Sequence, residues 1–178
     1  MNTAFHALTG LAIGQTAAAR LVAAAREERT PDDARALYAR VAAFTFLLCV
    51  MSHGVLDGLP HEYPFRALGD TLWTAGLVVA WMLLIRPRYR LLLAVAFIGA
   101  ELPDLIDHVP RDLDRHLGWH LPVLPKLFPW HHPEGSGSLS GYVLPMARVA
   151  SLVNHVIVVS FAATLMWTSR TALRDDPR

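Results

Sequence analysis

Long apolar stretches alternate along the chain with short polar or proline-containing connections. Five of these stretches have the character of membrane-crossing helices, and they cover residues 4–25, 36–57, 72–85, 91–105 and 143–167. The first is the least apolar, but its many Ala and Gly residues suit close helix packing. We therefore predict an all-α protein, a polytopic transmembrane helix bundle of about five spans in which residues 1–178 form a single integral membrane domain.

Two connections carry signals of their own. Before the second span, Thr30, Pro31 and Asp33 form a typical helix start, with Thr30 as N-cap and Pro31 in the first turn. The connection at residues 109–141 contains five prolines, two tryptophans and a Gly-Ser tether. Because it is too apolar for a solvated linker, we expect an irregular Pro/Trp-rich interfacial loop that folds back over the bundle.

Composition supports the membrane class and excludes others. The chain is 53% hydrophobic and only 17% charged, with a mean hydropathy of +0.33, which exceeds the apolar content of ordinary soluble domains. The net charge of +1 and the lack of a Lys/Arg-rich stripe argue against a nucleic-acid partner. Cys49 is the only cysteine, so an internal disulfide and a thiolate-rich zinc site are both excluded.

The distribution of basic residues predicts the topology. Most of them lie on one side of a five-span chain, at Arg20, Arg26, Arg29, Arg35, Arg40, Arg86, Arg88, Arg90, Arg170, Arg174 and Arg178. The positive-inside rule then places the C-terminus in the cytoplasm and the N-terminus outside. We predict a multi-pass protein of the bacterial inner (cytoplasmic) membrane.

This topology gathers the histidines on one side. Eight of the nine fall at or near the outer boundary, namely His6, His53, His61, His108, His116, His120, His131 and His132. The exception is His155, about a dozen residues into the last span. Next to Asn154, it fits an interhelical hydrogen bond better than a ligand role.

Two motifs within this group have the spacing of metal ligands. His53 and Asp57 stand four residues apart at the end of the second span, which places them on one helix face. Asp104 and His108 repeat the spacing at the end of the fourth span, and His6 lies at the start of the first. Ionisable groups at such positions are costly unless they are paired, hydrated or bound to a metal. We predict that these five residues hold a metal, with His61 as a lesser candidate in the loop after Pro60.

A shell of His and carboxylate ligands without sulfur suits Zn²⁺ best, and Mn²⁺ or Fe²⁺ as alternatives. Such a metal makes hydroxide available at neutral pH, and Glu101 or Asp107 could serve as general base. The competing interpretation is structural: Asp57 and Asp107 as helix-end caps or partners of nearby arginines, and single histidines as interfacial anchors.

The same residues resemble a known family. The segments concerned are Phe5-His6-Ala7-Leu8-Thr9-Gly10, Ser52-His53-Gly54-Val55-Leu56-Asp57 with Pro60-His61, and Leu102-Pro103-Asp104 with Asp107-His108. They are similar to the H-x-x-x-G, S-H-x-x-L-D and L-P-D-x-D-H motifs of the bacterial and archaeal membrane-bound metal-dependent hydrolases. The resemblance covers about the first 110 residues and implies a small multi-span protein with a metal.

The chain departs from that family pattern in two ways. Two residues separate Asp104 from Asp107 where the family has one, and the H-R-G-x-T-H-S motif of many members is absent. His131 and His132 are candidates to take its place.

These observations favour a membrane-embedded metal-dependent hydrolase that acts on a lipid or lipid-linked substrate at the outer leaflet. The bond would be a phosphoester or acyl bond, cleaved by metal-activated water. The alternative is a non-catalytic membrane protein, either a metal-binding or transport component or a partner scaffold.

Overall fold

A computed structural model describes residues 3–25, 30–59, 67–120, 122, 125–131 and 147–174. Among these residues there are helices and irregular connections but no strand, which confirms the all-α prediction for the described part of the chain. The elements in order are α1 (Thr3–Ala25), α2 (Pro31–Asp57), α3 (Ala67–Leu84), α4 (Pro87–Asp107), α5 (Val109–Leu117), the 3-10 turn η1 (Pro129–His131) and α6 (Ala147–Arg174).

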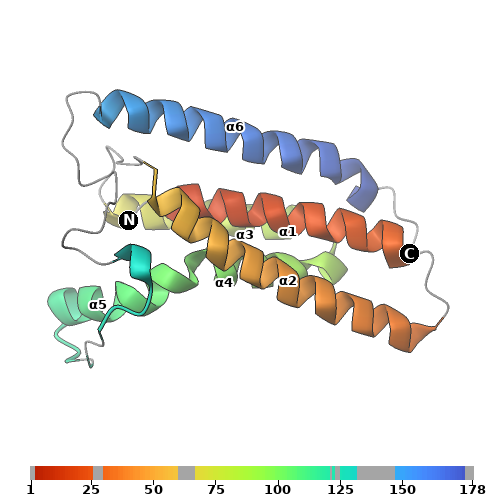
Figure 1. Ribbon diagram of the computed structural model, residues 1–178, viewed down its shortest axis with the longest axis horizontal. Coiled ribbons are helices and arrows are strands. Elements are labelled where there is room, and N and C mark those ends of the chain that lie inside the picture. Colours follow the sequence, from red (N-terminus) through yellow and green to blue (C-terminus); the bar gives the residue numbers. More distant parts are fainter. Residues whose placement is uncertain are drawn as a thin grey trace.

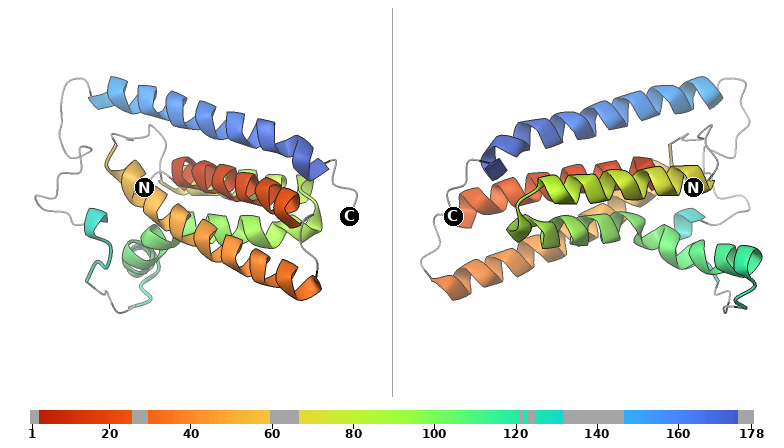
Figure 2. Two further views of the ribbon diagram at one scale, coloured as in Figure 1. Left: turned by 45° about the vertical axis from the view of Figure 1, so that its right-hand side comes forward. Right: turned by 180° about the vertical axis from the view of Figure 1, so that it is seen from behind.

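The long helices form a bundle around α1 (Figures 1 and 2). Helices α2, α3, α4 and α6 all contact α1: α2 and α4 run along one side of it, α6 along the opposite side, and α3 lies behind it in the view of Figure 1. The short elements α5 and η1 lie at the end of the bundle where α1 begins and α2 and α4 end. Three long helices therefore bring their ends to one place, with η1 beside them.

Helix α2 begins as the sequence predicts. The Thr30 side chain accepts a hydrogen bond from the Asp33 amide at 3.2 Å, and Pro31 occupies the first turn. Pro31 costs nothing there because an amide in the first turn has no partner within the helix. This cap confirms the predicted helix start.

Small residues allow α1 and α4 to touch. A Cβ atom added at Gly10 would lie 2.7 Å from the Cβ of Ala100, and one added at Gly14 would lie 2.6 Å from that of Ala96. Both pairs are four residues apart on their helices, so the contact runs along one face of each antiparallel helix. Close approach of this kind is typical of small-xxx-small interfaces. The same face of α1 carries His6, one turn before Gly10.

A buried glutamine links three helices in the interior. Gln15 on α1 is fully buried, and its amide donates a hydrogen bond to the Met166 carbonyl of α6 at 2.5 Å. Its side-chain oxygen accepts a hydrogen bond from the indole N–H of Trp81 on α3 at 3.0 Å. The polar group is thus satisfied on both sides, as burial requires.

The five predicted spans overlap α1, α2, α3, α4 and α6 in the described residues, but not all of these helices pass as membrane spans by length and composition. By length and composition, two helices in the described part of the chain could cross a membrane, at Pro31–Asp57 and Val149–Arg170. In each, 22% of the most apolar 18-residue window is buried inside the protein. Their outer faces carry exposed apolar side chains such as Phe44, Val55 and Phe161.

The loop predicted at residues 109–141 is partly helical, which corrects that prediction. Residues Val109–Leu117 form α5. Pro110 does not prevent this helix, because it lies in the first turn, where proline is tolerated. The helix ends at Gly118, whose φ of 62° is the left-handed conformation favoured by glycine. A second ordered piece is η1, and residues 132–141 lie outside the described part.

Candidate metal centre

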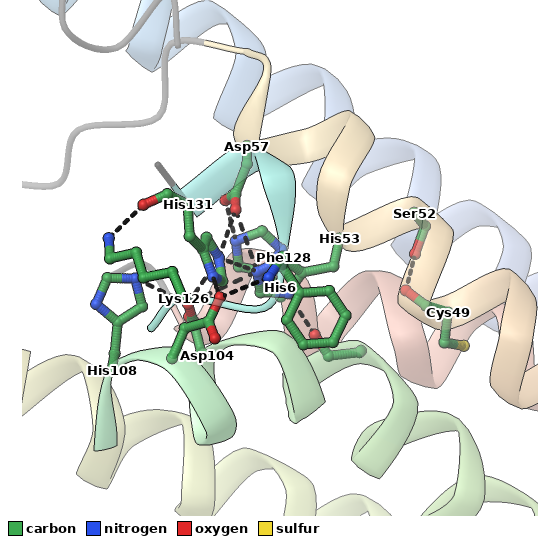
Figure 3. A network of polar contacts seen from close by, with 12 residues as sticks. His6, Cys49, Ser52, His53, Asp57, Asp104, His108, Lys126, Phe128 and His131 are labelled. Carbon is green, nitrogen blue, oxygen red and sulfur yellow. Dashed lines mark hydrogen bonds and ion pairs between the residues drawn. The ribbon is translucent and has the colours of Figure 1, made fainter. Parts of the chain in front are cut away.

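Two ligand candidates lie on the last turns of α2. This helix continues to Asp57, so His53 and Asp57 share a face, and His53 Nε2 lies 3.2 Å from Asp57 Oδ2. His53 is fully buried, while the Asp57 side chain is 13% exposed. Asp104, on the last turns of α4, brings its Oδ1 to 3.6 Å from the same His53 nitrogen. The structure thus brings these three predicted residues together at one end of the bundle (Figure 3).

A fourth side chain comes from η1. His131 Nε2 lies 3.0 Å from Asp57 Oδ2, 3.3 Å from Asp104 Oδ1 and 3.3 Å from His53 Nε2. Sequence reasoning named His131 only as a possible addition. Its one signal was the His-His pair in a proline-rich segment, with no helical spacing to connect it to the other ligands.

The second ring nitrogen of each histidine fixes its tautomer. His53 Nδ1 lies 2.5 Å from the Ala100 carbonyl, which can only accept, so Nδ1 carries the proton. His131 Nδ1 lies 2.9 Å from Asp107 Oδ2 and donates in the same way. The two Nε2 atoms face each other across 3.3 Å, between two carboxylates. With both Nε2 atoms unprotonated, these four groups could hold a metal ion between them.

The spacing of the donor atoms fits a tetrahedral metal. Five separations among the two nitrogens and two carboxylate oxygens range from 3.0 Å to 3.6 Å. Ligands about 2.0–2.1 Å from a tetrahedral Zn²⁺ are about 3.3–3.4 Å apart. The buried groups His6, His53, Asp57 and His53, Asp104, His131 could each hold a metal ion. Because the two groups share His53 Nε2, they are parts of one centre.

His6 stands at the edge of this set. Its Nε2 lies 3.2 Å from Oδ1 of Asp57, the oxygen that does not face His53 and His131. The ring is buried and stacks on the His53 ring, with centroids 3.8 Å apart and 17° between the planes. His6 can therefore act as a fifth ligand or as a residue that orients Asp57.

Asp107 has a different environment from the one the sequence suggested. Its Oδ1 accepts the Leu127 amide at 2.8 Å, and its Oδ2 accepts the Phe128 amide at 3.0 Å and His131 Nδ1. Burial acts to raise the pKa of this carboxyl, but these donors stabilise the ionised form and hold the pKa below its ordinary value. Asp107 thus lies behind His131 rather than at the converging atoms.

Glu101 and His108 flank the centre on α4. Glu101 lies one turn before Asp104 and is 4% exposed, and its Oε1 has no hydrogen-bond partner among the described residues. His108 Nε2 is 3.8 Å from Asp104 Oδ1, too far for a hydrogen bond, and the ring is 29% exposed. Burial lowers the pKa of His108. Of the two predicted base candidates, Glu101 is the carboxyl that the surroundings leave unengaged.

The remaining histidines are accounted for in part. His120 is exposed and pairs with Asp114, and His155 is buried on α6 with its Nδ1 2.6 Å from the Ser151 carbonyl of its own helix. Neither reaches the centre. His61 and His132 lie outside the described residues, as does the side chain of His116.

No family model, curated protein or solved structure compared with the chain matches it.

Proposed function

We propose that this protein is a membrane-embedded metal-dependent hydrolase with a single metal centre held by His53, His131, Asp57 and Asp104. The observation that carries the proposal is the convergence of two imidazole Nε2 atoms and two carboxylate oxygens, with separations of 3.0 Å to 3.6 Å. The ligand set favours Zn²⁺, with Mn²⁺ or Fe²⁺ as alternatives. When bound, such an ion supplies an activated water and polarises a substrate oxygen.

The protein's own groups contribute proton transfer. Glu101 is buried next to the centre, with one carboxyl oxygen unengaged among the described residues. We assign it the role of general base, which takes a proton from the attacking water and returns it to the leaving group. The products are then an alcohol and a phosphate or carboxylate, so the atoms of water are divided between them.

The substrate proposal rests on the position of the centre. It lies at the end of a bundle whose helices α2 and α6 expose apolar faces, such as Leu47, Met51, Leu152 and Ile157. A site at such an end is within reach of lipid headgroups. We therefore propose a lipid or lipid-linked substrate, and a chain that crosses the bacterial inner membrane about five times with the centre on the outer side.

The test combines metal analysis with turnover. Detergent-purified wild type should contain about one divalent metal per chain and release phosphate or fatty acid from mixed micelles of phosphate-ester and acyl-ester lipids. His53→Ala and Asp57→Ala should lose both metal and turnover, whereas His120→Ala, an exposed histidine, should lose neither. A wild-type protein that is metal-free but fully active would overturn the proposal.

A second candidate function is that of a non-catalytic metal-binding protein. It is supported by the number of protein donors, which is four. Structural metal sites are closed by four protein ligands, whereas catalytic sites keep a position open. Azide or phosphate added to the Co²⁺-substituted protein distinguishes the two. A change in the visible spectrum indicates an open position and supports the hydrolase, and an unchanged spectrum without turnover supports the closed site.

A further inference from the structure

His131 differs from the other ligands because no long helix holds it. The three other donors are carried on the last turns of α2 and α4, whose backbone is fixed by helical hydrogen bonds. His131 ends a 3-10 turn of three residues in a proline-rich segment. Something outside that turn must therefore hold its ring in place.

The segment that contains His131 is held at three points, and we call residues 125–131 the capping segment. Asp107 accepts hydrogen bonds from the amides of Leu127 and Phe128. The Lys126 ammonium donates to the His131 carbonyl, which closes the segment on itself. The Trp130 indole packs directly on α2, where a Cβ added at Gly54 would come within 2.7 Å of its ring.

Asp107 links the backbone of the segment to the side chain of His131. The same carboxylate that anchors the amides of Leu127 and Phe128 also accepts from His131 Nδ1, and its side chain is only 1% exposed. Asp107 lies three residues after Asp104, so one turn of α4 presents both carboxylates on neighbouring positions. Carboxylates that hydrogen-bond the far nitrogen of a metal-ligating histidine fix its tautomer and raise its basicity.

We infer that Asp107 is a positioning residue that delivers His131 to the metal centre and docks the capping segment over it (Figure 3). The expected change in metal affinity rests on the proposed function. The expected change in the tautomer of His131, measured without metal, does not. It assigns Asp107 a role other than general base. Loss of the Asp107 contacts should then weaken both metal binding and docking of the capping segment.

The experiment compares Asp107→Asn, His131→Ala and the double variant with wild type. Zn²⁺ affinity is measured by chelator competition, and the ligand field by the visible spectrum of the Co²⁺ form. Asp107→Asn should weaken Zn²⁺ binding roughly 10- to 100-fold, the usual effect of losing such a partner. In the His131→Ala background it should cause no further loss, because its effect passes through His131. Additive losses, or an unchanged affinity and spectrum in Asp107→Asn, would overturn the inference.

Two further variants test whether a loss of metal binding in Asp107→Asn comes from misfolding. Asp114→Asn is the matched control, since Asp114 also accepts a loop amide, that of His120 at 3.0 Å, away from the centre. It should bind metal as wild type does. Leu127→Pro removes one amide donor to Asp107 while its exposed side chain loses no packing. It should weaken metal binding in the same direction as Asp107→Asn, and an unweakened Leu127→Pro counts against docking through Asp107.

A metal-free readout separates this inference from the proposed function. In protein labelled with ¹⁵N-histidine, His131 of the wild type should show the tautomer with the proton on Nδ1, and Asp107→Asn should shift it. If wild type binds no metal but the tautomer shift is seen, the proposed function fails and the positioning role stands. If metal binds but the tautomer does not depend on Asp107, the positioning role fails alone.

Discussion

The imidazole rings of His6 and His53 are stacked with their centroids 3.8 Å apart, although one ring belongs to α1 and the other to α2. His53 Nε2 faces both Asp57 and Asp104, whereas His6 Nε2 pairs with Oδ1 of Asp57 at 3.2 Å. The two histidines therefore have unequal parts in the centre.

We therefore expect substitution of His6 to weaken metal binding less than substitution of His53. His6→Ala should weaken Zn²⁺ binding roughly tenfold, because it removes a group that orients Asp57 while four convergent donors remain. His53→Ala should abolish binding, because it removes a donor from the centre itself. Chelator competition on both purified variants measures the difference. Equal, complete losses would instead make His6 a full ligand.

Gly54 should be sensitive to the smallest substitution. Gly54→Ala places a methyl group 2.7 Å from the Trp130 ring, so the capping segment must move away from α2 and take His131 with it. We expect metal affinity to fall roughly tenfold or more. Gly76→Ala on α3 is the control, because a Cβ there meets nothing within 4 Å. It should leave affinity unchanged and raise stability by about 0.5–1 kcal/mol. Similar behaviour of the two variants would argue against a docked Trp130.

Gln15 should stabilise the bundle without affecting the centre. Gln15→Leu leaves the Trp81 N–H without its acceptor and removes the link to Met166, which should lower the free energy of unfolding by about 1–2 kcal/mol. Unfolding in mixed micelles with rising SDS measures this change. Thr16→Val removes a hydroxyl that bonds only the Ala12 carbonyl of its own helix, so its effect should be smaller. A larger effect of Thr16→Val would contradict the link.

The N-cap of α2 offers a test far from the centre. Thr30→Ala removes the side-chain oxygen that accepts the Asp33 amide and should lower the free energy of unfolding by about 1 kcal/mol. Thr30→Ser keeps an oxygen and should behave as wild type. The same unfolding measurement compares the variants, and metal content should be equal in all three. Loss of metal in Thr30→Ala alone would contradict this, because it would mean that disorder at the start of α2 disturbs His53 near its end.

Much of the fold follows from local chemistry. The helices, the cap at Thr30 and the shared face of His53 and Asp57 depend on residues a few positions apart, and periodicity or capping rules predict them. The helix over Val109–Leu117 does not follow from composition, because five prolines between residues 109 and 141 predict an irregular loop. Pro110 lies in a first turn and breaks nothing there. The number of membrane spans stays a prediction, with two helices long and apolar enough to cross.

The position of His131 could not be predicted in this way. It is fixed by a hydrogen bond to Asp107 across 24 residues and by the contact of Trp130 with Gly54, and neither leaves a periodic trace in the sequence. The hydrogen-bond partners of Asp107 are equally invisible in the sequence. A carboxylate three residues from a ligand has the spacing of a catalytic partner, and only the folded chain shows which donors it accepts.

The small-residue contact between α1 and α4 fixes the position of one helix along the other, and thereby the position of His6 relative to the other ligands. His6, Gly10 and Gly14 follow one another every four residues, as do Asp104, Ala100 and Ala96 on the facing helix. A slip of α1 by one residue would translate it about 1.5 Å and turn it about 100°, which would carry His6 away from Asp57. A bulkier residue at Gly14, two turns from the nearest ligand, would thus be detected first as a change in the affinity for metal.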